Sequence, residues 1–378
     1  MTGTVPETNL RIVSTVTASG EVRIELDETP PARPGDGQLL LRVEAVPLNP
    51  SDLMPMLAGG NPADARFEGS PERPVVTVPL TPQLAQAGAA RVGLPLAPGL
   101  GGAGTVVAAG KGAEALLGKR VAFLTIAMGA LARYCTVALE ECVELPDDIS
   151  AAEGADVFCN PLTALAMVET LRQTGQRAMI HTAAASNLGK MLVRICKEDG
   201  IPLVNIVRRG EQAEMLRALG ATHICDSSQP GFADELGRAV ADTGATVAFD
   251  AIGGGVMADR LLTAMEAAAA ARMGGFSPYG SQDMKRVYIY GLLDGSPTML
   301  PRAGYGMIWA VEGWAMPPVL ARAGAERTGA LVQRVVAGLT GTFASDFAQS
   351  VSLAGALSRD AMLRYCAKTT GGKYLVIP

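Results

Sequence analysis

The stretch from residue 177 to residue 250 opens with AMIHTA (178–183), continues with AASNLG (184–189) and goes on to KMLVRIC (190–196). The first run is short and apolar, which is typical of a buried strand. The second consists mostly of small residues, and the third has the apolar spacing of a helix. This part of the chain therefore predicts a strand, a tight turn and a helix in succession.

The same pattern repeats downstream. An apolar run at 202–207 precedes an amphipathic segment at 211–219, and further short apolar runs lie at 222–225 and 245–250. Strands that alternate with helices at this spacing form a doubly wound parallel sheet of the Rossmann type, which binds ligands at the carboxyl ends of its strands. The expected fold class for this region is α/β.

The turn at 184–189 has the properties of a phosphate-binding turn. Small side chains let backbone N–H groups approach a phosphate at the start of the following helix. Of the usual G-x-G-x-x-G pattern only the last glycine is present, so an ordinary turn without a ligand is the alternative. If a dinucleotide binds here, the expected contacts come from Ala185, Ser186, Asn187, Leu188 and Gly189.

The end of the second strand is basic. About 20 residues after the turn, where NAD enzymes carry an acidic residue for the ribose 2′-hydroxyl, this sequence has Arg208 and Arg209. Guanidinium groups suit a 2′-phosphate, so the pair predicts NADPH over NADH, with a solvated charged loop as the alternative. We also expect cofactor contacts at Ile252 and at Gly291, each close to the end of a later strand.

Length and composition indicate a soluble enzyme with two domains. The chain has 378 residues, of which 48% are hydrophobic and 18% charged. A net charge of -5 without a basic cluster argues against nucleic acid as a partner. The N-terminus lacks the pattern of a signal peptide, and no apolar stretch reaches membrane-spanning length. We therefore expect a cytoplasmic protein that does not associate with membranes.

Residues that could bind a metal are sparse. The chain has six cysteines and two histidines, without the closely spaced pairs that zinc sites use, so no metal is expected. The cysteines are expected to be reduced and mainly buried, as is usual in a cytoplasmic protein. His181 and His223 fall in expected strands, where a packed histidine is commoner than a catalytic one.

The residues before the Rossmann-type region resemble a different kind of domain. Residues 20–52 and 99–150 contain short apolar runs broken by glycine and proline. Such runs predict a compact, partly closed β-barrel. The proline-rich segment 59–98 is expected to be a loop with one short helix near 83–87, which either lines a cleft or forms a surface insertion.

Several motifs together resemble the medium-chain dehydrogenase/reductase superfamily. They are Asn49-Pro-Ser-Asp52, the glycine-rich run 99–107, Gly118-Lys-Arg-Val121, Leu145-Pro-Asp147, Asn160-Pro-Leu-Thr-Ala164, the turn at 183–189 and Leu219-Gly-Ala221. They run in the family's order over nearly the whole chain. Within the family the chain is similar to the zinc-independent quinone oxidoreductases and 2-enoyl thioester reductases. The resemblance implies a Rossmann domain at 156–318, inserted into a GroES-like catalytic domain at 1–155 and 319–378.

The resemblance also implies roles for individual residues. Asn49 and Thr163 would be catalytic-site residues beside the nicotinamide, where the threonine hydroxyl bonds the carboxamide, and Asn160 would also reach it. Arg208 would take the adenosine phosphate. The segments that carry zinc ligands in metal-containing relatives here read Asn49–Asp52 and Gly99–Gly101, so the resemblance implies a metal-free enzyme.

Two neighbours of Asn49 differ in expected role. Asp52 is expected to be structural and to bond backbone amides of its turn. Met54 stands where quinone oxidoreductases often carry a tyrosine, so no side-chain proton donor is evident.

The expected function is NADPH-dependent reduction of a small molecule, either a quinone or an α,β-unsaturated carbonyl compound. A 2-enoyl thioester reductase and a non-catalytic NADPH-binding protein are the alternatives. We also expect a homodimer. The apolar stretch 307–311 predicts an edge strand that would pair with its copy and bury both tryptophans, unless the long loop 274–283 covers it.

Overall fold

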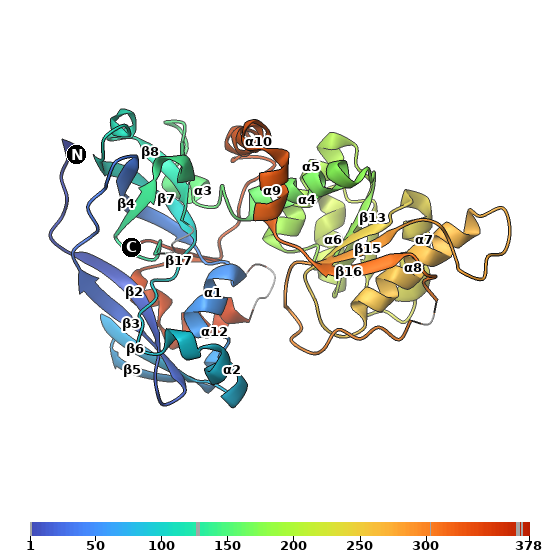
Figure 1. The fold of residues 1–378 in the computed structure, drawn as a ribbon, viewed down its shortest axis with the longest axis horizontal. Coiled ribbons are helices and arrows are strands. Elements are labelled where there is room, and N and C mark those ends of the chain that lie inside the picture. Colours follow the sequence, from blue (N-terminus) through green and yellow to red (C-terminus); the bar gives the residue numbers. More distant parts are fainter. Residues whose placement is uncertain (1, 126–128, 303, 368–370, 372) are drawn as a thin grey trace. The chain divides into compact units, whose positions relative to one another are not determined.

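The structure is a computed structural model that describes residues 2–125, 129–302, 304–367, 371 and 373–378. The chain forms two compact units (Figure 1): residues 1–159 together with 334–378, and residues 160–333. We call them the barrel-like unit and the nucleotide unit. The nucleotide unit extends past the expected limit of 318 because residues of the following helices bond to its first long helix.

The nucleotide unit contains a six-stranded sheet in the order β13-β12-β11-β14-β15-β16, and all of its neighbouring strands are parallel. The chain leaves the central strand β11 in one direction and then continues on its other side at β14, which confirms the doubly wound fold. The strands are β11 Met179–His181, β12 Leu203–Val207, β13 His223–Asp226, β14 Val247–Asp250, β15 Lys285–Ile289 and β16 Trp309–Gly313.

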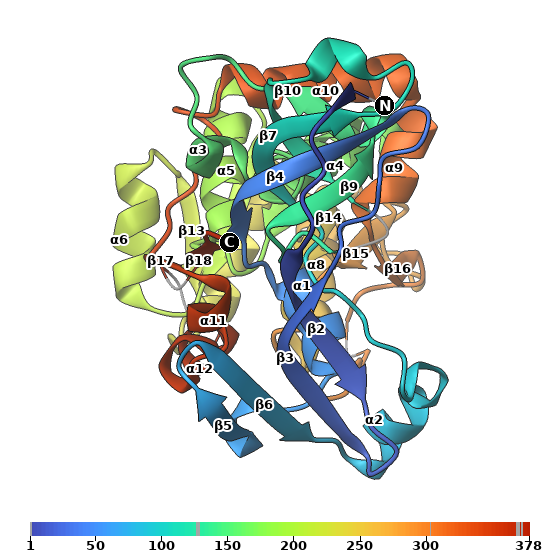
Figure 2. The same ribbon diagram turned by 90° about the vertical axis from the view of Figure 1, so that its left-hand side faces the viewer.

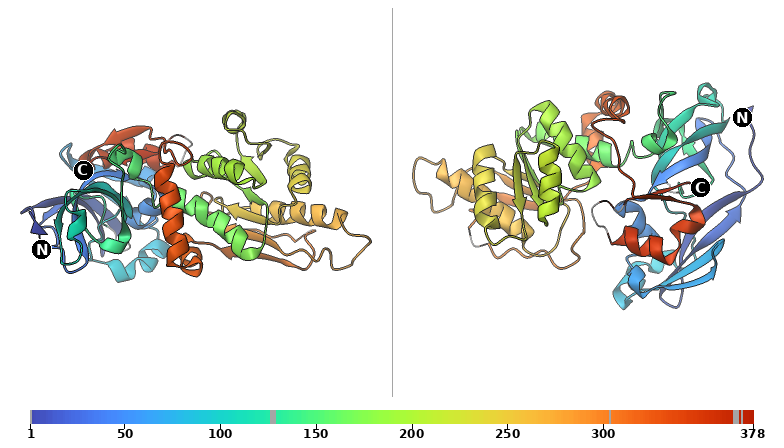
Figure 3. Two further views of the ribbon diagram at one scale, coloured as in Figure 1. Left: turned by 90° about the horizontal axis from the view of Figure 1, so that it is seen from above. Right: turned by 180° about the vertical axis from the view of Figure 1, so that it is seen from behind.

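Helices cover both faces of this sheet (Figure 3). Apolar residues of α7 and α8 pack with Ile180, Ala248 and Val287, which point to one face. His181 is adjacent to Ile180 and therefore points to the other face. The helices are α4 Asn160–Thr174, α5 Asn187–Asp199, α6 Gly210–Ala218, α7 Phe232–Thr243, α8 Met257–Ala271, α9 Met316–Ala323 and α10 Ala325–Ala337.

The barrel-like unit contains two further sheets over one hydrophobic core (Figure 2). The larger sheet has the order β10-β8-β7-β4-β18-β17, in which β1 also pairs with β7 and β9 with β4, and the smaller has the order β2-β3-β6-β5. The strands are β1 Thr2–Gly3, β2 Asn9–Val16, β3 Glu21–Thr29, β4 Gln38–Pro47, β5 Arg66–Ser70, β6 Arg73–Pro79, β7 Gly101–Ala109, β8 Arg120–Leu124, β9 Tyr134–Ala138, β10 Cys142–Glu144, β17 Gln349–Val351 and β18 Tyr374–Val376.

Glycines of β7 determine how closely this strand approaches β4. A Cβ atom at Gly102 would lie 2.4 Å from the carbonyl oxygen of Ala45, and one at Gly104 would lie 2.2 Å from that of Arg42. The glycine-rich run is therefore needed to build the sheet itself. Short helices complete the unit: α1 Pro50–Leu57, α2 Pro82–Ala87, α3 Ala151–Gly154, α11 Leu353–Ala356 and α12 Arg359–Cys366.

The segment 59–98 is more ordered than the sequence predicts. The expected short helix is α2, but the expected loop before it contains the hairpin β5–β6, and β6 pairs with β3. Pro74 and Pro79 fit because they lie near the two ends of β6. The pairing of β6 with β3 begins only at Val75, so the N–H group that Pro74 lacks is not needed for a hydrogen bond to β3.

The expected edge strand is β16, which pairs with β15 and ends the sheet. Each tryptophan packs within the unit and is half-buried there, so the burial of both by dimerisation stays a prediction. The Trp314 ring lies 5.5 Å from that of Phe249, and the Trp309 ring lies 5.1 Å from that of Tyr305. Loop 274–283 reaches the start of this strand, where Met307 N–H donates to the carbonyl of Tyr279 (3.0 Å).

Candidate cofactor site

The turn between β11 and α5 has a backbone shape that its sequence does not reveal. Ala183 adopts the left-handed conformation with φ of 52°, which is uncommon for a residue other than glycine. Two bonds hold the turn: Ala184 N–H donates to the carbonyl of Ile206 (3.1 Å), and Ser186 N–H donates to that of Ala183 (2.9 Å). The turn is thereby fixed to the end of the neighbouring strand β12.

Ser186 and Gly189 shape the start of α5. Ser186 is the N-cap, and its hydroxyl accepts from Gly189 N–H (3.1 Å). A Cβ atom at position 189 would lie 2.1 Å from the carbonyl oxygen of Ala184, so only glycine allows the helix to start this close to the turn. Ala185 and Leu188 are buried and support the turn through packing, while Asn187 is half-buried in the first turn of the helix.

A buried aspartate fixes the adjacent loop, and sequence reasoning assigned it no role. Asp250, at the end of β14, accepts from the hydroxyl of Thr182 (2.7 Å) and from the N–H groups of Ile252 (2.9 Å) and Gly253 (3.1 Å). Thr182 in turn accepts from Ala251 N–H (2.8 Å). The carboxyl ends of β11 and β14 are therefore joined. An aspartate that directly follows an apolar strand is the available sequence signal.

Close backbone contacts also join the loop after β14 to the residues that follow β15. A Cβ atom at Gly291 would lie 2.6 Å from the carbonyl oxygen of Ala251, and one at Gly253 would lie 2.7 Å from that of Gly291. Ile252 is half-buried between these glycines. The structure therefore brings the expected contact residues Ile252 and Gly291 together at the carboxyl edge of the sheet, next to the turn at 183–189.

The two arginines follow β12 at the same edge. Both Arg208 and Arg209 are exposed, and neither side chain forms an ion pair with another described residue. Arg208 N–H donates to the side-chain oxygen of Gln212 (3.0 Å), and Arg209 is the N-cap residue of α6. The backbone is held while both guanidinium groups stay available to an external anion.

Helix α4 supplies Asn160 and Thr163. Asn160 is the first residue of the helix, and Thr163 lies one turn further on, half-buried. The Thr163 hydroxyl lies 3.7 Å from the sulfur of Met316, the first residue of α9. Sequence reasoning did not identify Met316 as a site residue.

Asn49 lies in the barrel-like unit, as the N-cap of α1. Asp52 accepts from Asn49 N–H (2.8 Å) and from Leu100 N–H (2.9 Å), which confirms its expected structural role. Burial raises the pKa of the Asp52 carboxyl to about 6, although these backbone bonds favour the charged form. Met54 is exposed on the same helix.

Both histidines lie in strands, as expected, and His181 is fully buried in β11. Its Nε2 lies 2.8 Å from the hydroxyl of Tyr290, and burial lowers the pKa of the imidazole to about 3. Burial likewise raises the pKa of Tyr290 above its ordinary value. The pair is therefore uncharged at neutral pH, and it acts as packing beneath the carboxyl edge.

Among the residues that the structure describes, no group of three or more histidine, cysteine, aspartate and glutamate side chains could hold a metal ion. Within the same part of the chain, no helix has the length and apolar character needed to cross a bilayer.

The chain thus combines a barrel-like unit with a Rossmann-type nucleotide unit whose carboxyl edge is lined by glycines. Two family models match the chain in order: the alcohol dehydrogenase GroES-like domain over residues 35–147, and the zinc-binding dehydrogenase over residues 188–308. The chain belongs to the medium-chain dehydrogenase/reductase superfamily and resembles the quinone oxidoreductase branch of this superfamily.

The individual proteins that the chain resembles include quinone reductases and an enoyl reductase. A candidate NADPH:quinone reductase from Mesorhizobium loti is 25% identical with a TM-score of 0.72, and the match covers 99% of this chain and 100% of that one. The quinone oxidoreductase of Pseudomonas aeruginosa is 30% identical over 43% of this chain and 50% of its own length. The mitochondrial enoyl-[acyl-carrier-protein] reductase of Xenopus tropicalis is 30% identical over 52% of this chain and 50% of its own. The chain thus spans about half the length of these curated relatives.

Proposed function

We propose that the chain is an NADPH-dependent oxidoreductase that works without zinc and reduces a quinone or an α,β-unsaturated carbonyl compound. The observation that carries the proposal is the pair Arg208 and Arg209, two exposed cations at the carboxyl end of β12 that form no ion pair with another described residue. They stand where a 2′-phosphate binds in this type of sheet. The similarity to proteins named as quinone reductases supports the acceptor class.

The residues present fit a dinucleotide. A Cβ atom at Gly189 or Gly291 would collide with a carbonyl oxygen of the chain, so glycine is what lets the turn and the loop after β14 pack this closely at the carboxyl edge. Helix α5 begins at this edge, and the N-terminus of a helix suits a pyrophosphate. Arg208 and Arg209 would hold the 2′-phosphate, while Asn160 and Thr163 would hold the nicotinamide end.

Bound NADPH supplies the hydride, so the protein's contribution is to bind, orient and exclude water. We propose that Asn49 and Thr163 border the reacting ring. Asp52 holds the Asn49 turn through its backbone bonds to Asn49 and Leu100. The buried Asp250 holds the loop after β14 in place by accepting two bonds from its backbone N–H groups, and we propose that the cofactor lies against this loop.

Cofactor titration tests the proposal. Changing Arg208 and Arg209 to alanine removes charge-assisted contacts worth about 1.5–3 kcal/mol each in general, so we expect NADPH binding to weaken by at least about tenfold. NADH binding should change by less than about threefold. The matched control is Arg217→Ala, which removes an exposed arginine of α6 that pairs with Glu214. Equal losses for NADPH and NADH would refute the assignment.

Acceptor specificity needs a separate assay. NADPH oxidation would be followed with a quinone, an enone and a 2-enoyl thioester. The enoyl reductase relative makes the thioester the second candidate. Binding of NADPH without turnover of any acceptor would instead identify a non-catalytic NADPH-binding protein.

A further inference from the structure

The hydroxyl of Thr163 has an unusual partner. Met316 Sδ, at 3.7 Å, is its hydrogen-bond partner, and no other described residue bonds this hydroxyl. Two other threonines of α4 behave differently. Thr170 donates to the carbonyl of Ala166 and Thr174 to that of Thr170, both at 2.8 Å. Thr163 is also half-buried, whereas Thr170 is buried.

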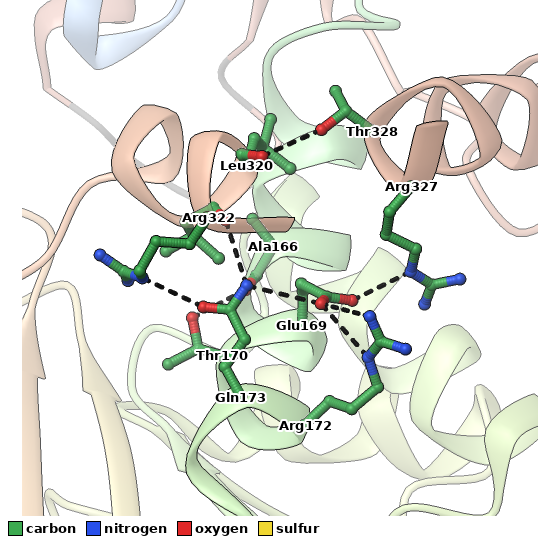
Figure 4. Close-up of polar contacts among 10 residues, drawn as sticks. Ala166, Glu169, Thr170, Arg172, Gln173, Leu320, Arg322, Arg327 and Thr328 are labelled. Atoms are coloured by element: carbon green, nitrogen blue, oxygen red, sulfur yellow. Dashed lines mark hydrogen bonds and ion pairs between the residues drawn. The ribbon is translucent and has the colours of Figure 1, made fainter. Parts of the chain in front are cut away.

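The residues on either side of Met316 bond to the second half of α4. The Trp314 indole N–H donates to Thr170 (3.0 Å), and the Gln173 side chain donates to the carbonyl of Val319 (3.1 Å). Figure 4 shows the adjoining contact, in which Arg322 donates to the oxygen of Gln173 (3.2 Å). The segment 314–322 therefore follows one face of α4, and Met316 is held at its first turn.

The chemistry of the two groups fixes the direction of the bond. A hydroxyl has one donor and two acceptor sites, whereas a thioether sulfur can only accept. The Thr163 proton must therefore point at Met316, and the lone pairs of the oxygen remain available. An oxygen presented in this way suits a ligand N–H donor and disfavours a ligand that offers only an acceptor.

We propose that Met316 is a positioning residue: it accepts the Thr163 proton and so presents the threonine oxygen to the amide NH2 of the nicotinamide carboxamide. This inference rests on the proposed NADPH function. It assigns Met316 a role in recognising the amide group of the cofactor, through Thr163 and without contact of its own.

The test compares NADPH with its 3-acetylpyridine analogue, which keeps the carbonyl but replaces the NH2 by a methyl group. Thr163→Val should weaken NADPH binding by about 3- to 10-fold, the usual range for one hydrogen bond, and leave the analogue nearly unchanged. Met316→Leu should weaken NADPH binding by about 2- to 5-fold, again without an effect on the analogue. In the Thr163→Val background, Met316→Leu should have no further effect.

Thermal unfolding of each variant monitors the fold, and Met215→Leu on α6 is the control for replacing a partly exposed methionine. Equal losses for NADPH and the analogue would mean that Met316 acts only through packing, and additive effects of the two changes would mean that it does not act through Thr163. Either result overturns the inference while the proposed function stands. Failure of the unaltered protein to bind NADPH would overturn both.

Discussion

Glu169 provides a quantitative test of how the nucleotide unit is held together. Its side chain on α4 is 1% exposed. It accepts from Arg172 (2.6 Å) and from Arg327 of α10 (3.1 Å), and the latter bond joins the two helices (Figure 4). The arginines are themselves 61% and 41% exposed, so they can return to water when the carboxylate is lost.

Glu169→Gln keeps the shape of the side chain but removes its charge. The two arginines bond different oxygens of the carboxylate, and glutamine replaces one of these by an NH2 group, so one charge-assisted bond is lost while solvent limits the penalty for the released cation. We expect a loss of about 2 kcal/mol in the free energy of unfolding. For a domain of this size that loss corresponds to a melting temperature lower by about 4–8 °C.

The pH dependence gives an independent readout. Burial alone would raise the pKa of Glu169, but the hydrogen bonds and charges of Arg172 and Arg327 outweigh it and lower the pKa below 4.5. A lowered pKa in the folded state stabilises the protein at neutral pH, and this contribution is lost as the pH falls through that value. The difference between the two proteins should therefore shrink in acid.

Urea unfolding at neutral pH and in acid measures both effects. The control is Glu214→Gln, which breaks an ion pair of the same i,i+3 spacing whose side chains are 75% and 55% exposed. Its expected cost is below about 0.5 kcal/mol. If Glu169→Gln costs no more than this control, or if its cost does not depend on pH, the buried carboxylate does not stabilise the unit as argued.

Two further predictions concern metal content and assembly. Protein purified without added metal should lack stoichiometric zinc by elemental analysis and keep its activity after dialysis against a chelator; zinc at one equivalent would contradict this. A homodimer formed through the outer edge of β16 should give twice the chain mass in light scattering, and Met307→Lys, at a residue 71% exposed, should shift it towards monomer. A monomeric native protein, or a dimer that ignores the lysine, would show that the edge is not the interface.

The parallel sheet could be predicted because its signals are local. Each strand of the nucleotide unit is a short apolar run, and the helices between them have their own periodicity. The hairpin β5–β6 was missed for the opposite reason. Its prolines indicate a loop, while the pairing that stabilises it joins β6 to β3, far away in the sequence. Local propensity carries no information about such a partner.

The candidate cofactor site shows the same contrast between features with a local sequence signal and features that depend on distant residues. The turn at 183–189 is local, and its small residues and its glycine predict a tight turn, which the structure confirms at Gly189. The bond between Thr182 and Asp250 joins residues 68 positions apart, and that between Thr163 and Met316 joins residues 153 apart. Such pairs become visible only when the sheet order and the position of α9 are known.

Burial distinguishes the polar residues that serve the fold from those available to a ligand. Asp250 and Glu169 are almost completely buried, and each has several partners within the nucleotide unit. A buried carboxylate without such partners would strongly destabilise the fold, so these bonds are required whether or not a ligand binds. Arg208 and Arg209 are exposed and form no ion pair with a described residue. Because water already solvates them, their conformation costs the fold little, and both remain available to the 2′-phosphate that we propose they bind.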